Sequence, residues 1–370
     1  MANQIYLIVD FSASKTFTHH WKSIEVFENF LSEKKSDISI FIPSYADTRL
    51  FSNLNNVKRI LISPDFGPSK EEKLTLYAWN KILKITLDNL SNFLSEKKMK
   101  NIRTFFIDFY VRNIFKKILE LEDKYEKINI LLPSAEPMSI RLMENLGIGL
   151  KGNLHWKIRL IGSQERGLLS NRNETERVRK FAETNMDNVK IGYETFPYKD
   201  YLLGKGFNQK FLHWSPFPAS YESHKKSAKT NLTTLGFLGS AKERKGFEAI
   251  PVIYSKLEKS KLKFNFLVQK AAYPWQSYEE TLTTLESLSR ITFLDGQIEA
   301  SEISSAIRQC DLIVLPYDSE SYALAASAIL YQAADNGIPV ICSEGVGFAK
   351  EVSTYGIGEV IKNFPFFLVL

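Results

Sequence analysis

Short runs of β-branched and aromatic residues alternate along the chain with longer segments in which apolar residues recur at every third or fourth position. The short runs are typical of buried strands. The longer segments, such as the one that carries Ile24, Phe27, Phe30 and Leu31, are typical of amphipathic helices. Regular alternation of the two predicts βαβ units, in which helices cover both faces of a mainly parallel sheet. In the first part of the chain, strands are expected at Ile5–Asp10, Ile38–Pro43, Lys58–Ser63, Thr104–Asp108, Ile128–Pro133, Lys157–Ile161, Val189–Tyr193 and Phe211–Trp214.

This rhythm is interrupted between Ser215 and Leu232, where prolines, serines and a lysine cluster replace the apolar period. Such a composition is typical of a linker. We therefore expect an N-terminal domain over residues 1–215, a linker over 216–232 and a C-terminal domain over 233–370. In the last of these, strands are expected at Thr234–Leu238, Lys263–Val268, Ile291–Leu294, Leu312–Pro316 and Pro339–Cys342, with helices near 247–257, 278–288, 301–309 and 326–336.

The two halves together predict an α/β fold of two Rossmann-like, doubly wound domains that face a cleft. Ligands of such proteins bind at the carboxyl edge of the sheet, so the loops that follow the strands are the first place to look for chemistry. The sequence has no internal repeat at a period of about 20 to 50 residues, which excludes solenoids and propellers.

The composition of the 370 residues agrees with a globular protein, because 44% are hydrophobic and 24% are charged. Cys310 and Cys342 are too few for a disulfide scaffold and indicate a reducing compartment, so a cytoplasmic protein is expected. No apolar run reaches the roughly 20 residues that a membrane-spanning helix needs. The N-terminus has no basic segment ahead of its apolar run and is interpreted as a first strand, not as a signal peptide.

The net charge is mildly positive, +6 from 48 basic and 42 acidic residues. This excess favours anionic partners such as nucleotides, phosphates or the acidic inner face of a membrane, and so permits peripheral membrane association. It falls short of what a nucleic-acid-binding protein usually shows, and acidic or neutral residues interrupt the lysine runs, so no nucleic-acid partner is expected. No cluster of His, Cys, Asp or Glu has metal-ligand spacing, and neither a metal nor another cofactor is expected.

The loop after the first strand of the C-terminal domain is a candidate anion site. Gly236 and Gly239 belong to this strand and its loop, and Lys245 and Gly246 stand at the expected start of the next helix. Free backbone N–H groups, the helix dipole and a lysine together attract a phosphate. The residue order of a Walker A loop is missing. The alternative, an exposed lysine-rich helix start, fits these residues equally well.

Two later loops of this domain are also candidate ligand-binding sites. The triplet Asp295–Gln297 follows a short strand, and its central Gly296 lets a flat ring approach the backbone, unless the segment is only a turn between strand and helix. A turn of small residues after a later strand contains Ser343, Gly345 and Gly347. Backbone amides in such a turn can line a phosphate or a sugar.

The order of these features is more specific than any one of them. A glycine followed by Lys-Gly, an Asp-Gly turn, the strand D-L-I-V-L-P, and N-G-I-P-V-I with its glycine loop succeed one another. This combination resembles the C-terminal, donor-binding domain of family-4 glycosyltransferases with the GT-B fold over Thr234 to Val360, while the first half fits only their general two-domain layout. The resemblance implies that Lys245 contacts the diphosphate of a nucleotide-sugar donor and that Gly239 lies at the same group. It further implies that the Asp295–Ile298 turn meets the base and that the Ser343–Gly347 loop lies near the transferred sugar.

The chain departs from the family's pattern within this domain. Ser240 stands where members usually carry an arginine, and the nearby Arg244 can supply that charge instead. Gln332 and Leu324 stand where members carry a pair of glutamates. An amide can still hydrogen-bond ribose hydroxyls, although without the charge of a carboxylate. Glu320, in a segment longer than the family's, can provide the missing carboxylate.

Candidate acceptor-side and catalytic groups come from the N-terminal domain. The loop after the first strand contains Ser14, and His19 and His20 fall in the opening turn of the following helix. Either histidine can hydrogen-bond a transferring sugar or act as a base, although a histidine at a helix start more often only packs or is solvated. Glu136, after another strand, and Arg166, whose planar fork suits phosphate or carboxylate, are further candidates at this edge.

We therefore expect a glycosyltransferase of the hexosyltransferase type that moves a sugar from a nucleotide-diphosphate donor to a glycan, lipid-linked or small-molecule acceptor, as in polysaccharide biosynthesis. Without a DxD triplet, lysine, arginine and helix N-termini would neutralise the leaving diphosphate, which suits a metal-independent reaction. The resemblance further implies retention at the anomeric carbon. Two alternatives stay open: a nucleotide-sugar epimerase of similar fold, and a degenerate, non-catalytic protein that binds a sugar nucleotide. The apolar C-terminal tail is expected to pack against the domain.

Overall fold

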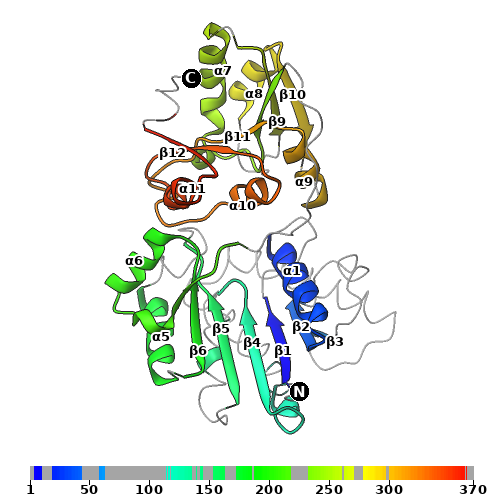
Figure 1. Ribbon diagram of the computed structural model, residues 1–370, viewed down its shortest axis with the longest axis vertical. Helices are drawn as coiled ribbons and strands as arrows, with labels where there is room; N and C mark the ends of the chain where they lie inside the picture. Colours follow the sequence, from blue (N-terminus) through cyan, green and yellow to red (C-terminus); the bar gives the residue numbers. More distant parts are fainter. Residues whose placement is uncertain are drawn as a thin grey trace, which may run out of the picture. The chain divides into compact units, whose positions relative to one another are not determined.

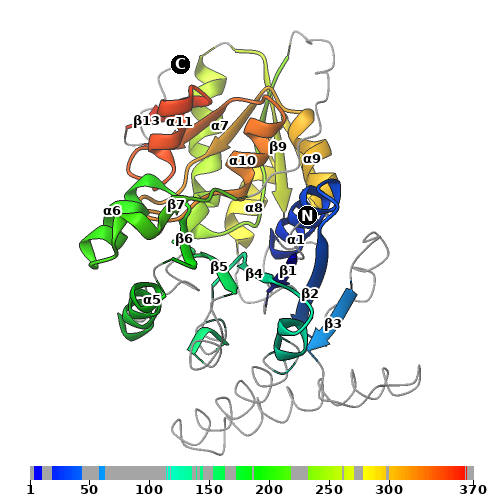
Figure 2. The ribbon, with the colours of Figure 1, turned by 60° about the horizontal axis from the view of Figure 1, so that its bottom comes forward.

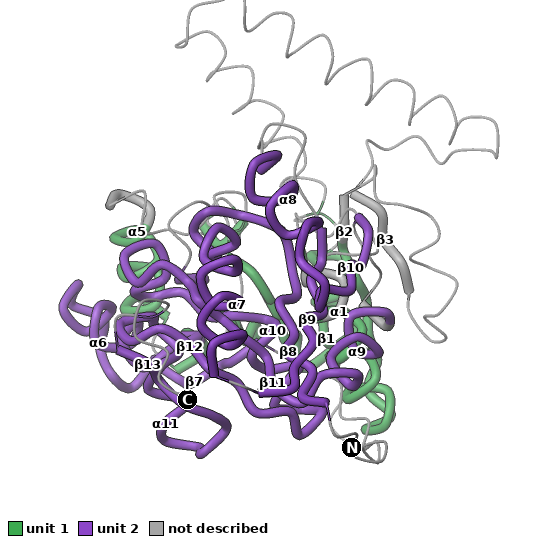
Figure 3. The backbone as a smooth tube through the Cα atoms, turned by 90° about the horizontal axis from the view of Figure 1, so that it is seen from above, with its two compact units in different colours: residues 1–159, 171–191 green, residues 160–170, 192–370 purple. Residues whose placement is uncertain are grey.

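The structure is a computed structural model, and its two compact units are coloured separately in Figure 3. Unit 1 comprises residues 1–159 and 171–191, and unit 2 comprises residues 160–170 and 192–370. Among the described residues, no helix is long and apolar enough to cross a membrane. The described residues are 4–10, 19–43, 58–62, 114, 116, 118–135, 139, 142–144, 153–162, 172–185, 187–217, 232–260, 262–270, 278–296, 300–362 and 364.

The first sheet is doubly wound about its first strand. Its strand order is β3-β2-β1-β4-β5-β6-β7, and the neighbours from β3 to β5 pair in parallel. The predicted strands are confirmed with shifts at their ends, except that the one expected at Thr104–Asp108 lies outside the described residues. The strands are β1 (Gln4–Val9), β2 (Asp37–Pro43), β3 (Lys58–Ile62), β4 (Lys127–Leu132), β5 (Leu154–Arg159), β6 (Val189–Tyr193) and β7 (Leu212–Trp214).

Helix α1 (His19–Glu33) forms where the periodic apolar pattern predicted it. Ile24 and Leu31 are buried, but Phe30 is 53% exposed, so its assignment to the apolar face was wrong. Positions 24, 27 and 31 follow the i, i+3, i+7 spacing of one helix face, whereas position 30 falls beside that stripe. Lys34 covers part of the exposed ring, with its Nζ 4.9 Å from the ring centre. A second helix of unit 1, α5, spans Arg172–Thr184.

The second sheet repeats the doubly wound order, as β10-β9-β8-β11-β12-β13, and all its pairs are parallel. The edge strand β13 was not predicted, because it begins at a glycine and its short run is only partly buried. Of the apolar tail, Phe364 is described, and it packs in the core as expected. The strands are β8 (Thr233–Phe237), β9 (Phe264–Lys270), β10 (Ile291–Asp295), β11 (Leu312–Leu315), β12 (Val340–Ser343) and β13 (Gly358–Ile361).

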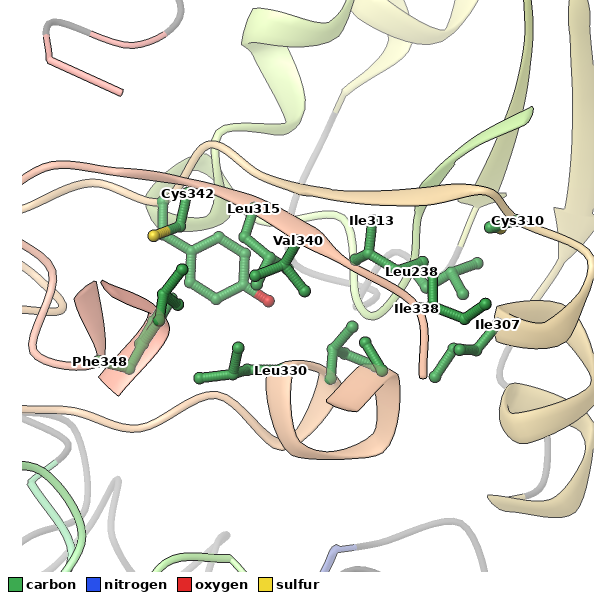
Figure 4. Close-up of a cluster of buried hydrophobic side chains, with 14 of the residues drawn as sticks. Leu238, Ile307, Cys310, Ile313, Leu315, Leu330, Ile338, Val340, Cys342 and Phe348 are labelled. Carbon is green, nitrogen blue, oxygen red and sulfur yellow. The ribbon is translucent and has the colours of Figure 1, made fainter. Parts of the chain in front are cut away.

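Helices cover both faces of this second sheet (Figure 1, Figure 2). Strand β12 shows the two-sided packing, since Ile341 belongs to the core beneath α7 and α8, while Val340 and Cys342 belong to the core beneath α9, α10 and α11. In the latter core, drawn in Figure 4, they join Leu330 of α10 and Phe348. The helices are α7 (Ile250–Lys259), α8 (Glu279–Glu286), α9 (Ala300–Arg308), α10 (Ala328–Asp335) and α11 (Ala349–Tyr355).

Within unit 2, hydrogen bonds and close backbone contacts join the segments around Gly162 and helix α6 (Phe196–Gly204) to the loop before α10 and to α11. The Thr195 hydroxyl donates a 2.9 Å hydrogen bond to the Leu324 carbonyl. The Phe196 N–H donates to a carboxylate oxygen of Glu351, also at 2.9 Å. A Cβ atom added at Gly162 would lie only 2.1 Å from the Leu324 carbonyl oxygen, so two backbones touch at this point.

Replacing Gly162 by Ala is expected to destabilise unit 2, because the added methyl group meets a backbone carbonyl that no side-chain rotation can move. We expect a loss of about 2 kcal/mol, or a fall in Tm of roughly 4 to 8 °C in differential scanning calorimetry. Gly204→Ala is the matched control, because a Cβ atom there meets nothing within 4 Å. It should leave Tm unchanged or raise it slightly. An unchanged Tm for Gly162→Ala would contradict the close packing.

The buried carboxylate of Glu351 predicts a pH dependence of stability. Burial raises the pKa of Glu351 above its usual 4.5. The folded state therefore binds this proton more tightly than the unfolded state, and the stability that the group contributes at low pH is lost as pH rises through the raised pKa. Glu351→Gln keeps an acceptor for the Phe196 N–H, so in urea unfolding its stability relative to the parent should increase from about pH 5 to about pH 8. A stability difference between variant and parent that stays constant or falls from about pH 5 to about pH 8 would contradict the raised pKa.

Candidate functional site

The centre of the second sheet is its topological switch point. Strands β8 and β11 are neighbours there, and the chain continues from them toward opposite edges of the sheet. Doubly wound sheets bind ligands outside the carboxyl ends of the strands at this point. The loop after β8 carries Gly239, Arg244 and Lys245, and the loop after β11 carries Glu320, so the order of the strands brings these predicted loops to the same edge.

The glycine loop after β8 is joined to the turn after β10 by one side chain, that of Gln269. Gly239 has a φ of +106°, a conformation that favours glycine. Its N–H donates a 2.7 Å hydrogen bond to Gln269 Oε1, and Gln269 Nε2 donates a 3.0 Å bond to the Gly296 carbonyl. Gln269 is buried near the end of β9 and thereby ties three strand ends together.

The sequence pattern did not predict that Gln269 joins two loops of the site. The available signal was a long polar side chain near the end of the apolar run F-L-V-Q. A buried amide needs hydrogen-bond partners, and at the end of a strand those partners are the backbone groups of neighbouring loops. The pattern alone does not say which loops these are, because that depends on the strand order.

Lys245 lies just before the helical segment that was expected from about residue 247, and the first turn of that segment is a 3-10 turn. Two short 3-10 turns, Glu243–Lys245 and Phe247–Ala249, precede α7, which begins at Ile250. Gly246 separates the turns with a left-handed φ of +68°. A Cβ atom on Gly246 would lie 2.1 Å from the Pro316 carbonyl oxygen, so the loops after β8 and β11 touch through their backbones here.

The amine of Lys245 points back over the glycine loop. A Cβ atom added at Gly239 would lie 2.9 Å from Lys245 Nζ, and the same Nζ lies 5.6 Å from the centre of the Tyr317 ring. Burial raises the pKa of Tyr317 to about 12, so its phenol stays neutral beside the amine. No described carboxylate forms an ion pair with Lys245. The switch point therefore holds a cation that is available to an anionic ligand.

Arg244 and Ser240 occupy different parts of the same loop. The Arg244 guanidinium lies 5.5 Å from the centre of the Tyr322 ring, and the Arg244 carbonyl accepts a 2.9 Å hydrogen bond from the Asp318 N–H. Ser240 follows Gly239 directly and is partly buried. The structure thus places the guanidinium of Arg244 against the loop after β11, with its backbone fixed there.

The residues that were predicted to bind the base and the ribose lie at the carboxyl edge of the second sheet or on α10. Asp295 is exposed and its carboxylate lies 3.4 Å from Lys270 Nζ, while Gly296 has a left-handed φ of +69°. Gln297 lies outside the described residues. Gln332 on α10 has a buried side-chain oxygen without a hydrogen-bond partner among the residues that the structure describes. Glu320 is exposed in the loop after β11.

The predicted small-residue loop after β12 divides into two parts. Gly347 packs against the loop before α10, because a Cβ atom there would come within 3.0 Å of the Ala323 carbonyl oxygen, and its N–H donates to the Tyr322 carbonyl at 2.7 Å. Ser343 and Gly345 instead line a cavity of about 840 Å³. Lys245 is not among the residues that line this cavity.

The predicted site residues of the first half fall outside the described part of the chain, entirely or in their side chains. Ser14, Glu136 and Arg166 lie outside the described residues, and His19 and His20 open α1 with side chains outside them as well. The switch point of the first sheet, between β1 and β4, has a buried Ser134 hydroxyl with no partner among the described residues. In the described part of the chain, no group of three or more His, Cys, Asp or Glu is arranged to hold a metal ion.

Comparisons with known proteins establish the fold. No model of a protein family matches the sequence, and no curated protein matches it. Among solved structures, the chain is similar to WaaG, a glycosyltransferase involved in lipopolysaccharide biosynthesis, at 14% identity and a TM-score of 0.50 over 98% of this chain and 86% of that one. It is similar to the lipopolysaccharide outer core galactosyltransferase WaaB in its apo form, at 13% identity and a TM-score of 0.55 over 98% and 87%.

A further similar structure is that of trehalose-6-phosphate from E. coli bound with UDP-2-fluoro glucose, at 11% identity and a TM-score of 0.60 over 98% of this chain and 88% of that one. A structural similarity at such low sequence identity shows the fold and no more. The two Rossmann-like sheets and the matches along nearly the whole chain confirm the resemblance noted in the sequence. This chain has the GT-B fold of glycosyltransferases.

Proposed function

We propose that the protein is a glycosyltransferase whose nucleotide-diphosphate sugar binds at the switch point of the second sheet. The observation that carries this proposal is the amine of Lys245, which lies over Gly239 and Tyr317 without an ion-pair partner among the described carboxylates. A diphosphate carries two or more negative charges and is the part of the donor that such a cation recognises. Structures similar in fold include one bound with UDP-2-fluoro glucose, which supports this class of donor.

In this proposal the chain's own cations stabilise the departing diphosphate. Negative charge grows on the leaving oxygen as the bond to the sugar breaks, and a positioned ammonium stabilises it without reorganisation of water. Lys245 is placed for this role, with Arg244 on the same loop as a second positive charge. The Gln269 amide holds the Gly296 turn at a fixed position relative to the glycine loop, which suits a base on one and a diphosphate on the other. Gln332, with its unpartnered oxygen, would accept from a ribose hydroxyl.

The acceptor side is proposed for the expected N-terminal domain, residues 1–215. His19, His20, Ser14, Glu136 and Arg166 would meet the acceptor or the transferring sugar, with retention at the anomeric carbon as the family resemblance implies. A glycan or lipid-linked acceptor is favoured, since WaaG and WaaB act in lipopolysaccharide synthesis and have this fold. Such an acceptor would place the protein in the cytoplasm at the inner face of a membrane, where its +6 charge favours anionic lipids.

A non-catalytic, sugar-nucleotide-binding protein is the second candidate, favoured by Ser240 and Gln332 in place of charged family residues. Incubation with a panel of radiolabelled nucleotide sugars and candidate acceptors separates the functions. Transfer of label to a glycan or lipid supports the proposal. Label in an isomerised nucleotide sugar indicates an epimerase, and binding without turnover indicates the non-catalytic protein.

Replacing Lys245 by Ala should weaken nucleoside diphosphate binding roughly 10- to 100-fold, because a charge-assisted hydrogen bond to phosphate is lost. Isothermal titration calorimetry with UDP, GDP and ADP measures this and identifies the base. Lys263→Ala is the matched control, because Lys263 is exposed and precedes β9 at the opposite edge of the sheet. An equal loss of nucleoside diphosphate affinity in the two variants, or an unchanged affinity in Lys245→Ala, would show that Lys245 does not bind the diphosphate.

Gln269 provides a test of how the two loops are held together. Gln269→Leu removes the acceptor of the Gly239 N–H and should cost about 1 to 3 kcal/mol of stability in urea unfolding. Gln269→Glu keeps an acceptor but cannot donate to Gly296, and it adds a negative charge beside the glycine loop. It should therefore lower the affinity for a nucleoside diphosphate more than that for the nucleoside alone. The same loss for both ligands would mean that Gln269 acts only on stability.

A further inference from the structure

A second site is indicated by the cavity that Ser343 and Gly345 line. Its volume is about 840 Å³, and it lies among the start of α7, the ends of β11 and β12, and Phe364. Pockets for small organic ligands commonly have volumes of roughly 300 to 1,000 Å³. Gly246 and Tyr317 line it but Gly239, Lys245 and Gln269 do not, so it adjoins the proposed diphosphate site without including the Lys245 amine.

The cavity is acidic. Its lining includes four carboxylates, those of Glu243, Glu248, Asp318 and Glu344, and no Lys, Arg or His. No basic side chain in the described part of the chain forms an ion pair with any of the four. Hydrogen bonds from the Ser321 side chain and from the Ser321 N–H, the latter 2.7 Å from Asp318 Oδ1, hold the pKa of Asp318 below its usual range. A diphosphate would be repelled here, whereas a cation would be attracted.

Apolar side chains form another part of the cavity wall. Ala249 and Val252 come from the start of α7, Pro316 from the end of β11, and Phe364 from the segment after β13. Val252 is 38% exposed although it is a large aliphatic residue. Carboxylates beside such a wall suit a ligand that combines positive charge with an aliphatic body.

The side chain of Ser343 is an independent sign of a ligand. Ser343 is only 6% exposed and lines the cavity. Along β12 it follows Cys342, which faces the core beneath α10, so alternation turns its side chain to the α7 face, where the cavity lies. Its hydroxyl has no hydrogen-bond partner among the residues that the structure describes. Because the residue lines the cavity, this hydroxyl is positioned to exchange a hydrogen bond with a ligand bound there.

We propose that this cavity binds a small organic cation, an aliphatic chain that carries two or more protonated amines. The ammonium groups would pair with the carboxylates of Glu248, Asp318 and Glu344, and one would donate to the Ser343 hydroxyl. The methylene chain would lie against Val252 and Phe364. This site goes beyond the proposed donor site and does not depend on it.

Spermidine is the probe, titrated calorimetrically into the full chain at low ionic strength and without nucleotide. We expect saturable binding to one site. The double variant Glu248→Gln and Glu344→Gln should weaken it about tenfold, and Ser343→Ala several-fold. The matched control changes two exposed carboxylates at the start of α8, Glu279→Gln and Glu280→Gln, and should leave the affinity unchanged.

Three results would overturn the site: no saturable binding, equal losses in the cavity and control variants, or complete displacement of spermidine by magnesium chloride at equal ionic charge. The last would show only a diffuse counter-ion atmosphere. Because no nucleotide is present, failure of this experiment leaves the test of Lys245 unaffected. Unchanged nucleoside diphosphate affinity in the Glu248→Gln and Glu344→Gln variant would show that the two sites are separate.

Discussion

The proposed donor site depends on a steric fact: the amine of Lys245 occupies space that a side chain on Gly239 would fill. A Cβ atom there would lie 2.9 Å from Lys245 Nζ, and the positive φ of Gly239 is itself a glycine conformation. Below the amine lies a neutral phenol, that of Tyr317, which attracts a cation without neutralising it. The result is a lysine that is positioned by packing, so that its charge is available for a ligand.

Glycines hold the surrounding loops at distances that other residues would not allow. At Gly246 the loop after β8 touches the backbone at Pro316, and at Gly347 the loop after β12 touches the segment before α10. These contacts fix the edges of three strands relative to one another. Gly347 thus has a role in packing, and its place near a transferred sugar stays a prediction.

Much of the fold was accessible from the sequence because strand and helix periodicities are local signals. Buried runs such as Leu312–Leu315 end at Pro316 as the pattern indicated, and the alternation of strands and helices predicted parallel, doubly wound sheets, although not the order of their strands. Features that depend on contacts between distant loops were not accessible. The close approach of Gly246 to Pro316 is one such feature, and the role of Gln269, which follows from the adjacency of β8, β9 and β10, is another. The acidic character of the cavity also arises from residues far apart in sequence.

Two regions of opposite charge therefore share one sheet edge, a cation over the glycine loop and carboxylates around the cavity on the α7 face. The most direct test of the central assignment is a crystal structure of the full chain with a nucleoside diphosphate. We expect a phosphate oxygen within hydrogen-bond distance of Lys245 Nζ, about 2.7 to 3.2 Å, with the base at the Gly296 turn. A diphosphate bound elsewhere, with the Lys245 amine turned to solvent, would contradict it.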